Sequence, residues 1–444
     1  MDKKTISVTI VVVILIVASV SAFVMLDDKD DAVAKSFDDA ELKVYGNVNG
    51  DRFLDEADAK LIEQYVKDGK TVEDCPLADA NQDGKLTMDD VEVVNAVVQG
   101  RATTINHLVY KDVDQDGVVD TQVVFTKFPV KSAIMTGSTN TSMLLFCLGI
   151  TDQIKGASYS SSSLDKDLFK ETYLDTTKCV KLGTSSSAIT FEDGKAGSSD
   201  VIKTQNVTAL ITDWNRTYIT NENDFENAGV DVVRVSAGST DKDVLTHSAM
   251  LLGLLFQCAD RANDYVDLSL SVIEYIQGIA KNEAKVKAVS SSMNGYLSTV
   301  ASDYGELIAT IGGEYPLPVD AFGGATSGNI VDHPEIYANY SFDYILHVRS
   351  NLNYVQTQDT IDKMWNTYTK AFSDWEHSET GQYMISGMIP VAMRAAYAGQ
   401  IFYSDVDADK VTEFHQEFVD KFFNGKTYDV SSLKFIISAG DVSS

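Results

Sequence analysis

The sequence contains few of the residues that build transition-metal, redox or nucleic-acid sites. Its six histidines are scattered, so they do not form the cluster that a zinc or manganese site requires. The four cysteines show no Cys-x-x-Cys spacing, which argues against a zinc knuckle or a redox pair and leaves one disulfide open. Only 36 Lys and Arg residues face 65 Asp and Glu residues, for a formal net charge of −29. This balance excludes nucleic acid as an expected partner, because phosphate binding requires a concentrated basic surface.

Sequence fingerprints of common enzyme classes are also missing. The chain has no Gly-x-Ser-x-Gly nucleophile motif, no phosphate-binding P-loop and no dinucleotide-binding glycine motif. We therefore expect a binding protein rather than an enzyme. With 444 residues, 44% of them hydrophobic, the chain is long enough to form two or three folded units.

An uncharged apolar segment lies at the N-terminus. It runs for 22 residues from Thr5 to Leu26, and as a helix it would span roughly 33 Å, which is enough to cross a bilayer. Lys3 and Lys4 precede it and acidic residues follow it, so the positive-inside rule places the rest of the chain outside the cell. We expect residues 1–26 to form a single-pass membrane anchor. Cleavage of a signal peptide near Val20-Ser21-Ala22, which would give a secreted protein, is the alternative.

Two acidic segments with the same ligand spacing follow an acidic linker of residues 27–43. Calcium takes six to eight oxygen ligands, and a tight loop of this spacing directs alternate oxygens inward. The expected ligands of the first segment are Asn47, Asn49, Asp51, Phe53, Asp55 and Asp58. Phe53 would contribute its main-chain carbonyl, and the others their side chains. The expected ligands of the second segment are Asp79, Asn81, Asp83, Lys85, Thr87 and Asp90. Lys85 would contribute its main-chain carbonyl, and the others their side chains.

The two segments differ at the position where a glycine normally relieves the sharp turn. The second has Gly84 there and the first has Arg52, so we expect the first to bind calcium more weakly. Apolar residues at helical spacing follow each segment and predict a helix after each.

Residues 44–103 resemble a dockerin, which is an EF-hand pair with Asp at the twelfth loop position. The resemblance implies calcium as the cofactor. It also implies a cohesin domain as a partner, contacted through Glu56-Ala57 and Met88-Asp89. A calcium-stabilised spacer without a protein partner is the alternative.

A third acidic cluster lies between Asp112 and Asp120. Its twelfth position is Val123, and the flanking segments Ile105–Tyr110 and Val118–Phe125 alternate as strands do. We interpret residues 104–127 as a β-hairpin that leads into the next domain. A loosely held cation at its turn is a further possibility that the acidic residues leave open.

From Val130 onward, short apolar strands alternate with helical stretches, a pattern typical of an α/β fold. A long proline-free segment, Asp241–Glu283, carries apolar residues at helical spacing. We therefore expect two α/β lobes, residues 128–257 and 285–444, bridged by one long helix, residues 258–284. The complete expected architecture adds the small all-α EF-hand pair and the transmembrane helix before them. The expected strands are Lys131–Met135, Ile154–Ala157, Ala209–Thr212, Val230–Val235, Val286–Ser290, Tyr344–Val348 and Tyr383–Ile385.

The start of each lobe carries motifs in a recognisable order. In the first lobe, the strand of Phe128–Met135 is followed by a polar turn, a helix from Thr139 to Gly149 and a second strand in Asp152–Ala157. In the second lobe, Gly312-Gly313 and Pro334-Glu335 precede the strand-like run from Phe342 to Leu346. This order resembles the solute-binding proteins that serve ABC importers of iron chelates, haem and cobalamin.

That resemblance implies a receptor that captures a metal chelate of the iron–siderophore, haem or cobalamin type and delivers it to an ABC permease. In the family, each lobe presents an acidic residue to an arginine of the permease, which orients docking through charge-assisted hydrogen bonds. The matching residues here are Glu335 in the second lobe and Asp200 in the first, with Glu192 as an alternative to Asp200. An ordinary solvated acidic residue is the competing interpretation of each.

The ligand of such a protein is expected in the cleft, at the loops that follow the carboxyl ends of the strands. Arg216 and Arg349 would hold an anionic group, and Trp214, Tyr315 and Tyr354 would stack on a planar ring. The alternative function is that of a cell-surface adhesion or scaffold-associated protein acting through dockerin–cohesin binding. The residues on the expected loops are Ser138, Thr139, Asn140, Tyr159, Trp214, Arg216, Tyr315, His347, Arg349 and Tyr354.

Overall fold

The structure is a computed structural model of the whole chain. It describes residues 40–111, 120–136, 139–158, 178–183, 189–191, 198–213, 219, 222–291, 294–349, 352–372, 380–424 and 427–443. The N-terminal apolar segment, most of the third acidic cluster and the residues Ser138, Tyr159, Glu192, Trp214 and Arg216 lie outside these ranges. Among the described residues, no helix combines the length and the apolar character needed to cross a membrane.

The first described unit, residues 44–103 (the module), contains two short helices that each follow an acidic loop. Helix α2 spans Glu56–Lys67 and helix α3 spans Met88–Val98. Asp55 and Thr87 cap them, and the residue three positions later, Asp58 or Asp90, bonds back to the cap to complete a capping box. The predicted helices are therefore present. In each case the N-cap is the ninth residue of the loop and the helix begins at the tenth, so the twelfth-position carboxylate also stabilises the helix start.

A long antiparallel hairpin joins the module to the rest of the chain. Strand β1 (Thr103–Lys111) pairs with β2 (Asp120–Phe128) over their full length, from Thr103 opposite Phe128 to Lys111 opposite Asp120. Both strands extend beyond the predicted segments, and they contact β7 of the following domain.

Lobe 1 is built on a five-stranded sheet of order β5-β4-β3-β6-β7, and the strand pairs are parallel. The four strands predicted from the sequence match β3, β4, β6 and β7 within two residues at each end, whereas β5 was not predicted. The elements are β3 (Ala133–Met135), α4 (Thr139–Cys147), β4 (Ile154–Ser158), β5 (Val180–Gly183), α6 (Ser199–Gln205), β6 (Ala209–Asp213), α7 (Glu222–Asn227) and β7 (Asp231–Val235).

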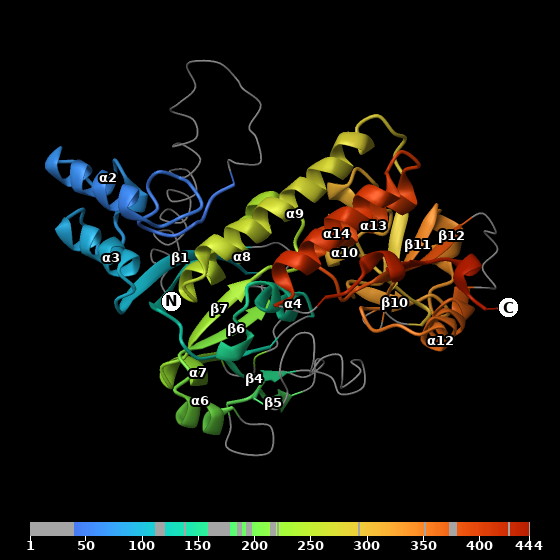
Figure 1. Cartoon of the computed structure of the whole chain (residues 1–444), viewed down its shortest axis with the longest axis horizontal. Coiled ribbons are helices and arrows are strands. Elements are labelled where there is room, and N and C mark those ends of the chain that lie inside the picture. The colour runs from blue at the N-terminus through green and yellow to red at the C-terminus, as the bar shows by residue number, and fades with distance from the viewer. Residues whose placement is uncertain are drawn as a thin grey trace.

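The long proline-free segment forms two helices. Helix α8 (Lys242–Leu255) packs on α9 (Ala259–Ala280), and Gln257 between them has a positive φ of 60°. Helix α9 lies within the expected interlobe helix of residues 258–284, and the left-handed residue before it reverses the chain direction without a proline or glycine. Helix α9 then runs diagonally from lobe 1 to lobe 2 (Figure 1).

Lobe 2 is built on a four-stranded sheet of order β13-β12-β11-β8, in which only β13 is antiparallel. Its three parallel strands were predicted, while β13 and the small antiparallel pair of β9 and β10 were not. The elements are β8 (Ala288–Ser291), β9 (Tyr296–Ser298), α10 (Asp303–Thr310), β10 (Ser327–Asn329), α11 (Glu335–Asn339), β11 (Tyr344–Arg349), α12 (Gln358–Tyr368), β12 (Gly381–Ser386), α13 (Val391–Phe402), α14 (Ala408–Phe422) and β13 (Ile436–Ile437).

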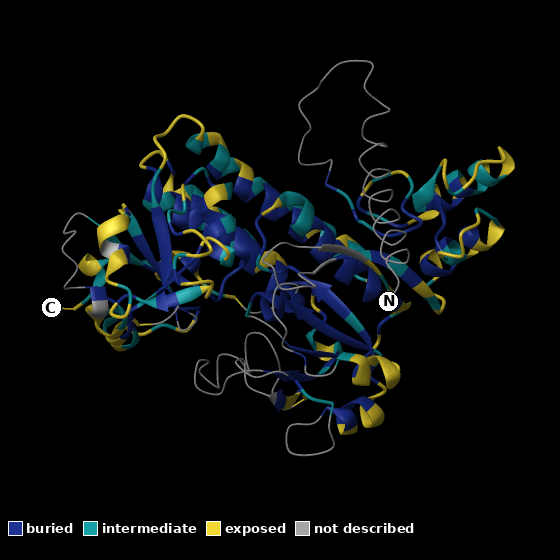
Figure 2. Ribbon diagram, turned by 180° about the vertical axis from the view of Figure 1, so that it is seen from behind, coloured by how far each residue is buried: buried dark blue, intermediate teal, exposed yellow. Residues whose placement is uncertain are grey.

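One continuous core joins all three units. A single cluster of buried apolar side chains runs from Leu42 and Ile62 at the module, through Val266 of α9, to Phe418 of α14. Figure 2 shows buried residues along both sheets and exposed residues gathered at the ends of α2 and α3. The four cysteines are all free thiols, so the disulfide that the sequence left open is not formed.

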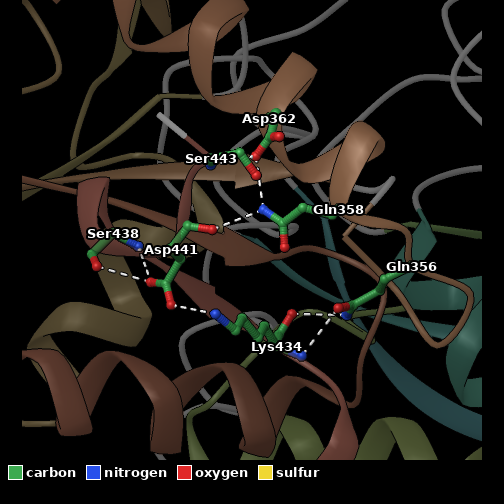
Figure 3. Close-up of polar contacts among 7 residues, drawn as sticks. All are labelled: Gln356, Gln358, Asp362, Lys434, Ser438, Asp441 and Ser443. Atoms are coloured by element: carbon green, nitrogen blue, oxygen red, sulfur yellow. Dashed lines mark hydrogen bonds and ion pairs between the residues drawn. The ribbon is translucent and has the colours of Figure 1, made fainter.

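The C-terminal segment is fixed to lobe 2 by a polar network (Figure 3). Asp441 accepts hydrogen bonds from the main-chain N–H and hydroxyl of Ser438, both at 2.8 Å, and forms an ion pair with Lys434 at 2.6 Å. Gln358 of α12 donates to the main-chain carbonyl of Asp441 at 2.9 Å, and Ser443 donates to Asp362 at 3.0 Å.

Candidate functional site

The carboxyl ends of the parallel strands in the two lobes define the candidate ligand site. Because β3, β6 and β7 are parallel and in register, Met135, Asp213 and Val235 lie at one edge of the lobe 1 sheet. In lobe 2, the same relation places Arg349 of β11 and Ser386 of β12 at one edge. Ligands of open α/β sheets bind at such edges, where the loops diverge.

Two of the predicted ligand residues lie where the lobes touch. Thr139, at the start of α4, donates its hydroxyl to the main-chain carbonyl of Gly387 in lobe 2 at 3.5 Å. Asn140 donates from Nδ2 to Asp303 of α10 at 3.1 Å. Its Oδ1 is buried and has no hydrogen-bond partner among the described residues. The start of α4 therefore contacts lobe 2.

Glu306 of α10 makes the densest polar contact between the lobes, and the sequence analysis missed it. Its Oε1 accepts hydrogen bonds from the main-chain N–H groups of Thr240 at 2.5 Å and Asp241 at 2.9 Å. The hydroxyls of Ser239 and Thr240 also donate to this oxygen, at 2.7 and 3.2 Å. Ser-Thr-Asp before an apolar run does signal a helix start, but nothing in the sequence indicates that a carboxylate from lobe 2 binds there.

Gly238 allows this close approach of the lobes. A Cβ atom at this position would lie 2.2 Å from Nδ2 of Asn140 and 3.0 Å from Oδ2 of Asp303. Any side chain here would therefore displace the hydrogen bond between the other two residues, so the glycine is required by contact rather than by backbone conformation.

Asp213 at the carboxyl end of β6 was also not predicted. It is buried, and it accepts a hydrogen bond from the Thr141 hydroxyl at 2.5 Å. Arg234 of β7 donates to its main-chain carbonyl at 3.3 Å and forms an ion pair with Glu222 of α7. These contacts fix the carboxyl end of β6.

The predicted ligand residues of lobe 2 lie largely in its interior. His347, Arg349 and Tyr354 are buried, and Tyr315 is half-buried with its hydroxyl bonded to Ser290 and Ser298. None of these side chains is presented on the surface of the strand-end region in this structure. His347 and Arg349 are packed because their strand, β11, lies between β8 and β12, which leaves its side chains covered on both faces.

Individual contacts account for this placement. His347 bonds Gln382 at 3.1 Å, and burial, with the charge of Arg349 adding to it, lowers its pKa to about 3. The Arg349 guanidinium lies 3.5 Å from the centre of the Tyr368 ring, and burial lowers its pKa to about 10. Tyr354 and Tyr397 share His415, whose two ring nitrogens lie 2.7 and 2.8 Å from their hydroxyls.

The two predicted docking carboxylates are exposed on opposite lobes. Asp200 lies in the first turn of α6 in lobe 1, and Glu335 begins α11 in lobe 2. His333 bonds Glu335 at 3.0 Å. The pKa of Glu335 is lowered by a hydrogen bond from its own main-chain N–H and then by that of His333. It is therefore an ionised surface carboxylate, available to a cationic partner.

Calcium loop 2 (residues 79–90) has the geometry of an oxygen-lined turn. Asp79 is buried and accepts hydrogen bonds from the main-chain N–H groups of Asp83 and Gly84, at 3.1 and 3.0 Å. Asp90 is buried and accepts from Asn81 at 3.2 Å and Thr87 at 2.8 Å. Gly84 has a φ of +82°, the left-handed conformation that favours glycine at this turn.

Calcium loop 1 (residues 47–58) has a similar arrangement around an amide. Nδ2 of Asn47 donates to the carbonyls of Leu42 and Asp51, both at 2.7 Å. Its Oδ1 is buried without a hydrogen-bond partner among the described residues. Asp58 is fully buried and accepts from Val48, Asn49 and Asp55 at 2.9, 3.2 and 3.0 Å.

The residues of both loops fit a hard cation. Burial raises the pKa of Asp58, and burial together with the charge of Asp90 raises that of Asp79. A divalent cation would compensate these buried carboxylates and would satisfy the orphaned Asn47 oxygen. No cluster of three or more His, Cys, Asp or Glu side chains suited to a metal occurs within the described ranges. The oxygen donors of each loop are instead a mixture of carboxylate, amide, hydroxyl and main-chain groups.

Comparison with known proteins finds one matching domain model and several similar structures. Residues 45–99 match the model of the dockerin type I domain. No curated protein sequence matches the chain. Among solved structures, the chain is similar to the TroA-like periplasmic binding protein FepB from Veillonella parvula. That match has a TM-score of 0.51 at 15% identity and covers 71% of this chain and 97% of that one.

A second similar structure is the molybdate periplasmic binding protein MolA of a Haemophilus influenzae ABC transporter, bound to molybdate. Its TM-score is 0.51 at 12% identity, with 72% of this chain and 99% of that chain covered. At such identities the likeness establishes a shared fold. Both structures are of periplasmic binding proteins.

Proposed function

We propose that the protein is the substrate-binding component of an ABC importer and captures a metal chelate of the iron–siderophore, haem or cobalamin type. The observation that carries the proposal is the meeting of two parallel sheets at their carboxyl ends, where Thr139 and Asn140 of lobe 1 contact lobe 2. The binding-protein fold and the missing enzyme motifs support a role in capture without catalysis.

The proposed ligand site lies at the strand-end loops around this contact. Thr139 and Asn140 supply polar groups beside it, and Ser138, Tyr159, Trp214 and Arg216 follow β3, β4 and β6 in the sequence. His347, Arg349, Tyr315 and Tyr354 would support the lobe 2 wall from within rather than contact the ligand by side chains on its surface. Because one similar structure holds molybdate, an oxyanion is included among the ligands to be tested.

We further propose that the receptor docks on its permease through Asp200 and Glu335. Both are exposed carboxylates on helix starts of different lobes, so a permease with two arginines could orient the receptor by contacting both lobes. The N-terminal apolar segment, on the sequence evidence alone, would tether the protein outside the cell.

Calcium is the proposed cofactor of the module. Loop 1 would hold it through Asn47, Asn49, Asp51, Asp55, Asp58 and the Phe53 carbonyl. Loop 2 would hold it through Asp79, Asn81, Asp83, Thr87, Asp90 and the Lys85 carbonyl. When bound, the ion supplies positive charge that offsets the buried carboxylates, and the chain supplies the turns that direct oxygens inward.

A ligand screen tests the transport proposal. The full chain, purified in a mild detergent with calcium, is heated with haem, ferric siderophores, cobalamin or molybdate, and its melting temperature is compared with the ligand-free value. A ligand present at 100 times its Kd should stabilise the fold by about 2.7 kcal/mol. Arg216→Ala should weaken binding about tenfold, as expected for loss of a charge-assisted hydrogen bond, whereas Arg101→Ala in the module should not. No shift with any ligand would count against a receptor role.

A second candidate function follows from the dockerin match at residues 45–99. In that case the module would attach the protein to a cohesin-bearing scaffold, and the exposed Met88 at the start of α3 would belong to the contact surface. Binding to a panel of cohesin domains in calcium, lost in chelator, would support it. The two functions are compatible, because the module and the strand-end site are different surfaces of the chain.

A further inference from the structure

The module contacts lobe 1 through hydrogen bonds to helix α8 as well as through the covalent link to strand β1. The main-chain N–H of Lys43 donates to Nδ1 of His247 on α8 at 3.1 Å, and Nε2 of that ring lies 2.8 Å from the carbonyl of Leu108 in β1. Leu108 in turn donates its main-chain N–H to the carbonyl of Lys43 at 3.1 Å. The entry to the module is therefore bonded to both the hairpin and α8.

Calcium loop 2 contacts the hairpin directly. Nδ2 of Asn106 in β1 donates to the carbonyl of Ala80, the second residue of loop 2, at 2.9 Å. The carbonyl of Asn106 accepts from the N–H of Tyr45 at 2.8 Å. One asparagine thus connects a proposed calcium loop to the strand that packs on lobe 1.

Calcium loop 1 reaches further, to the helix that connects the lobes. Nη1 of Arg52 donates to Oδ1 of Asn263 at 3.1 Å and forms an ion pair with Asp267, one turn along α9. Its Nε donates to the carbonyl of Ala40 at 3.3 Å. Asn263 and Asp267 are themselves bonded at 2.9 Å. The guanidinium is almost fully buried, with 7% of Arg52 exposed, so it fills the space between loop 1 and α9.

The backbone of loop 1 is adapted to this arginine. In loop 2 the fourth and sixth positions, Gln82 and Gly84, both have positive φ values, of 59° and 82°. In loop 1 the fourth position, Gly50, has a φ of 70°, but Arg52 at the sixth position is not among the residues with positive φ. The sixth position of loop 1 therefore tolerates a side chain at no conformational cost.

From this geometry we infer that calcium loop 1 is a brace for the interlobe helix, and that calcium binding in it orders α9 through Arg52. Arg52 lies between two proposed ligands, the Asp51 side chain and the Phe53 carbonyl, so the ion would fix the backbone on both sides of it. The ordered backbone then holds the guanidinium against Asn263 and Asp267. Calcium occupancy and the order of α9 are thereby linked, and by reciprocity the contact with α9 strengthens calcium binding.

The inference rests on calcium binding by the loops, which is part of the proposed function. It gives the module a role within the chain that requires no external partner. In this interpretation Arg52, which replaces the usual turn glycine, couples loop 1 to α9 and does not merely weaken calcium binding.

Hydrogen exchange on the full chain tests the brace. Deuterium uptake is measured by mass spectrometry in calcium and in chelator, with the peptides of loops 1 and 2 and residues 259–271 of α9 followed separately. We expect chelation to accelerate exchange in 259–271 about fivefold, at the lower end of couplings between sites. In Arg52→Gly, which restores the usual turn residue, calcium should still protect both loops while its effect on α9 is lost.

Asp267→Ala breaks the same contact from α9 and leaves the loop sequence intact, so it should reproduce the effect on α9 and weaken one calcium site. Arg101→Gly is the matched control, since Arg101 pairs with Glu92 within the module, and it should leave the coupling unchanged. Calcium protection of the loops without any effect on α9 in the native chain would overturn the brace alone. Retention of the α9 effect in Arg52→Gly would do the same. Loops that calcium does not protect would overturn calcium binding and the brace together.

Discussion

Oε1 of Glu306 in lobe 2 accepts a hydrogen bond of 2.9 Å from the main-chain N–H of Asp241 in lobe 1. Asp241 caps α8, so the carboxylate binds at the start of the helix where unpaired N–H groups carry partial positive charge. Three further donors from Ser239 and Thr240 converge on the same oxygen. This junction holds the two lobes together beside the proposed ligand site.

Replacing Glu306 with alanine should therefore destabilise the chain and loosen the lobes. Hydrogen bonds to a charged group contribute about 1.5–3 kcal/mol, and the main-chain donors of lobe 1 would lose their acceptor. We expect the free energy of urea unfolding to fall by about that amount. Glu413→Ala removes a carboxylate from an exposed ion pair with Lys410 and should change it by less than about 1 kcal/mol. Equal effects of the two substitutions would show that the interlobe bond contributes nothing specific.

This junction also shows which features a sequence can and cannot predict. The strands of lobe 1 were predictable because short apolar runs such as Ala209–Thr212 are buried on both faces of a parallel sheet. The two helices of the module were predictable because the apolar pattern and the capping residues of each lie within a short stretch of sequence. Glu306, by contrast, bonds a residue 65 positions away.

Long-range packing explains the remaining differences. Arg52 meets Asp267 across 215 positions, and no local pattern reports that pairing. Tyr354 and Arg349 were placed on a cleft because strand-end loops are often functional, but the packing of Tyr354 with His415 and of Arg349 on Tyr368 buries them. The sequence therefore does not report the direction in which these side chains point.

Calcium removal should lower the thermal stability of the full chain. The buried carboxylates of loops 1 and 2 repel each other without a cation, and calcium at 100 times its Kd would add about 2.7 kcal/mol. Asp90→Asn and Asp58→Asn keep the shape of the capping box but remove a charge, so each should abolish one calcium site in titration calorimetry. Asp89→Asn, at the exposed neighbour of Asp90, is the control and should leave both sites intact. Unchanged stoichiometry in Asp90→Asn would contradict the ligand assignment of loop 2.

The C-terminal network predicts a local stability effect (Figure 3). Burial opposes ionisation of Asp441, but the Lys434 ion pair and the bonds from Ser438 prevail, so its pKa is lowered. Asp441→Asn should cost about 1–2 kcal/mol, because a charged acceptor of several hydrogen bonds becomes neutral. We expect faster hydrogen exchange in residues 434–443 and a lower unfolding free energy. Asp359→Asn, in an exposed pair with Lys363, is the control and should have little effect on either.

Buried histidines predict how stability depends on pH. His107 is fully buried against Thr126, and burial lowers its pKa to about 4. His247 accepts the Lys43 N–H on Nδ1, and burial, followed by the proximity of His107, lowers its pKa to about 3. Burial likewise lowers the pKa of His347 and of His415 to about 3. All four are therefore neutral in the folded chain at pH values where the unfolded chain begins to bind protons.

The sign of the effect follows from this difference. Below about pH 6.5 the unfolded chain takes up protons that the folded chain excludes, so stability is fully present above that pH and falls as the pH drops toward 4. Each histidine can contribute up to about 1.4 kcal/mol per pH unit in this window. Urea unfolding should be measured between pH 8 and 5 in saturating calcium, because most carboxylates remain ionised in this pH range. His247→Asn removes one of the four buried rings, so it should make the fall in unfolding free energy with decreasing pH less steep by the contribution of one histidine. A slope that is flat down to pH 5 would show that the four rings already titrate normally in the fold.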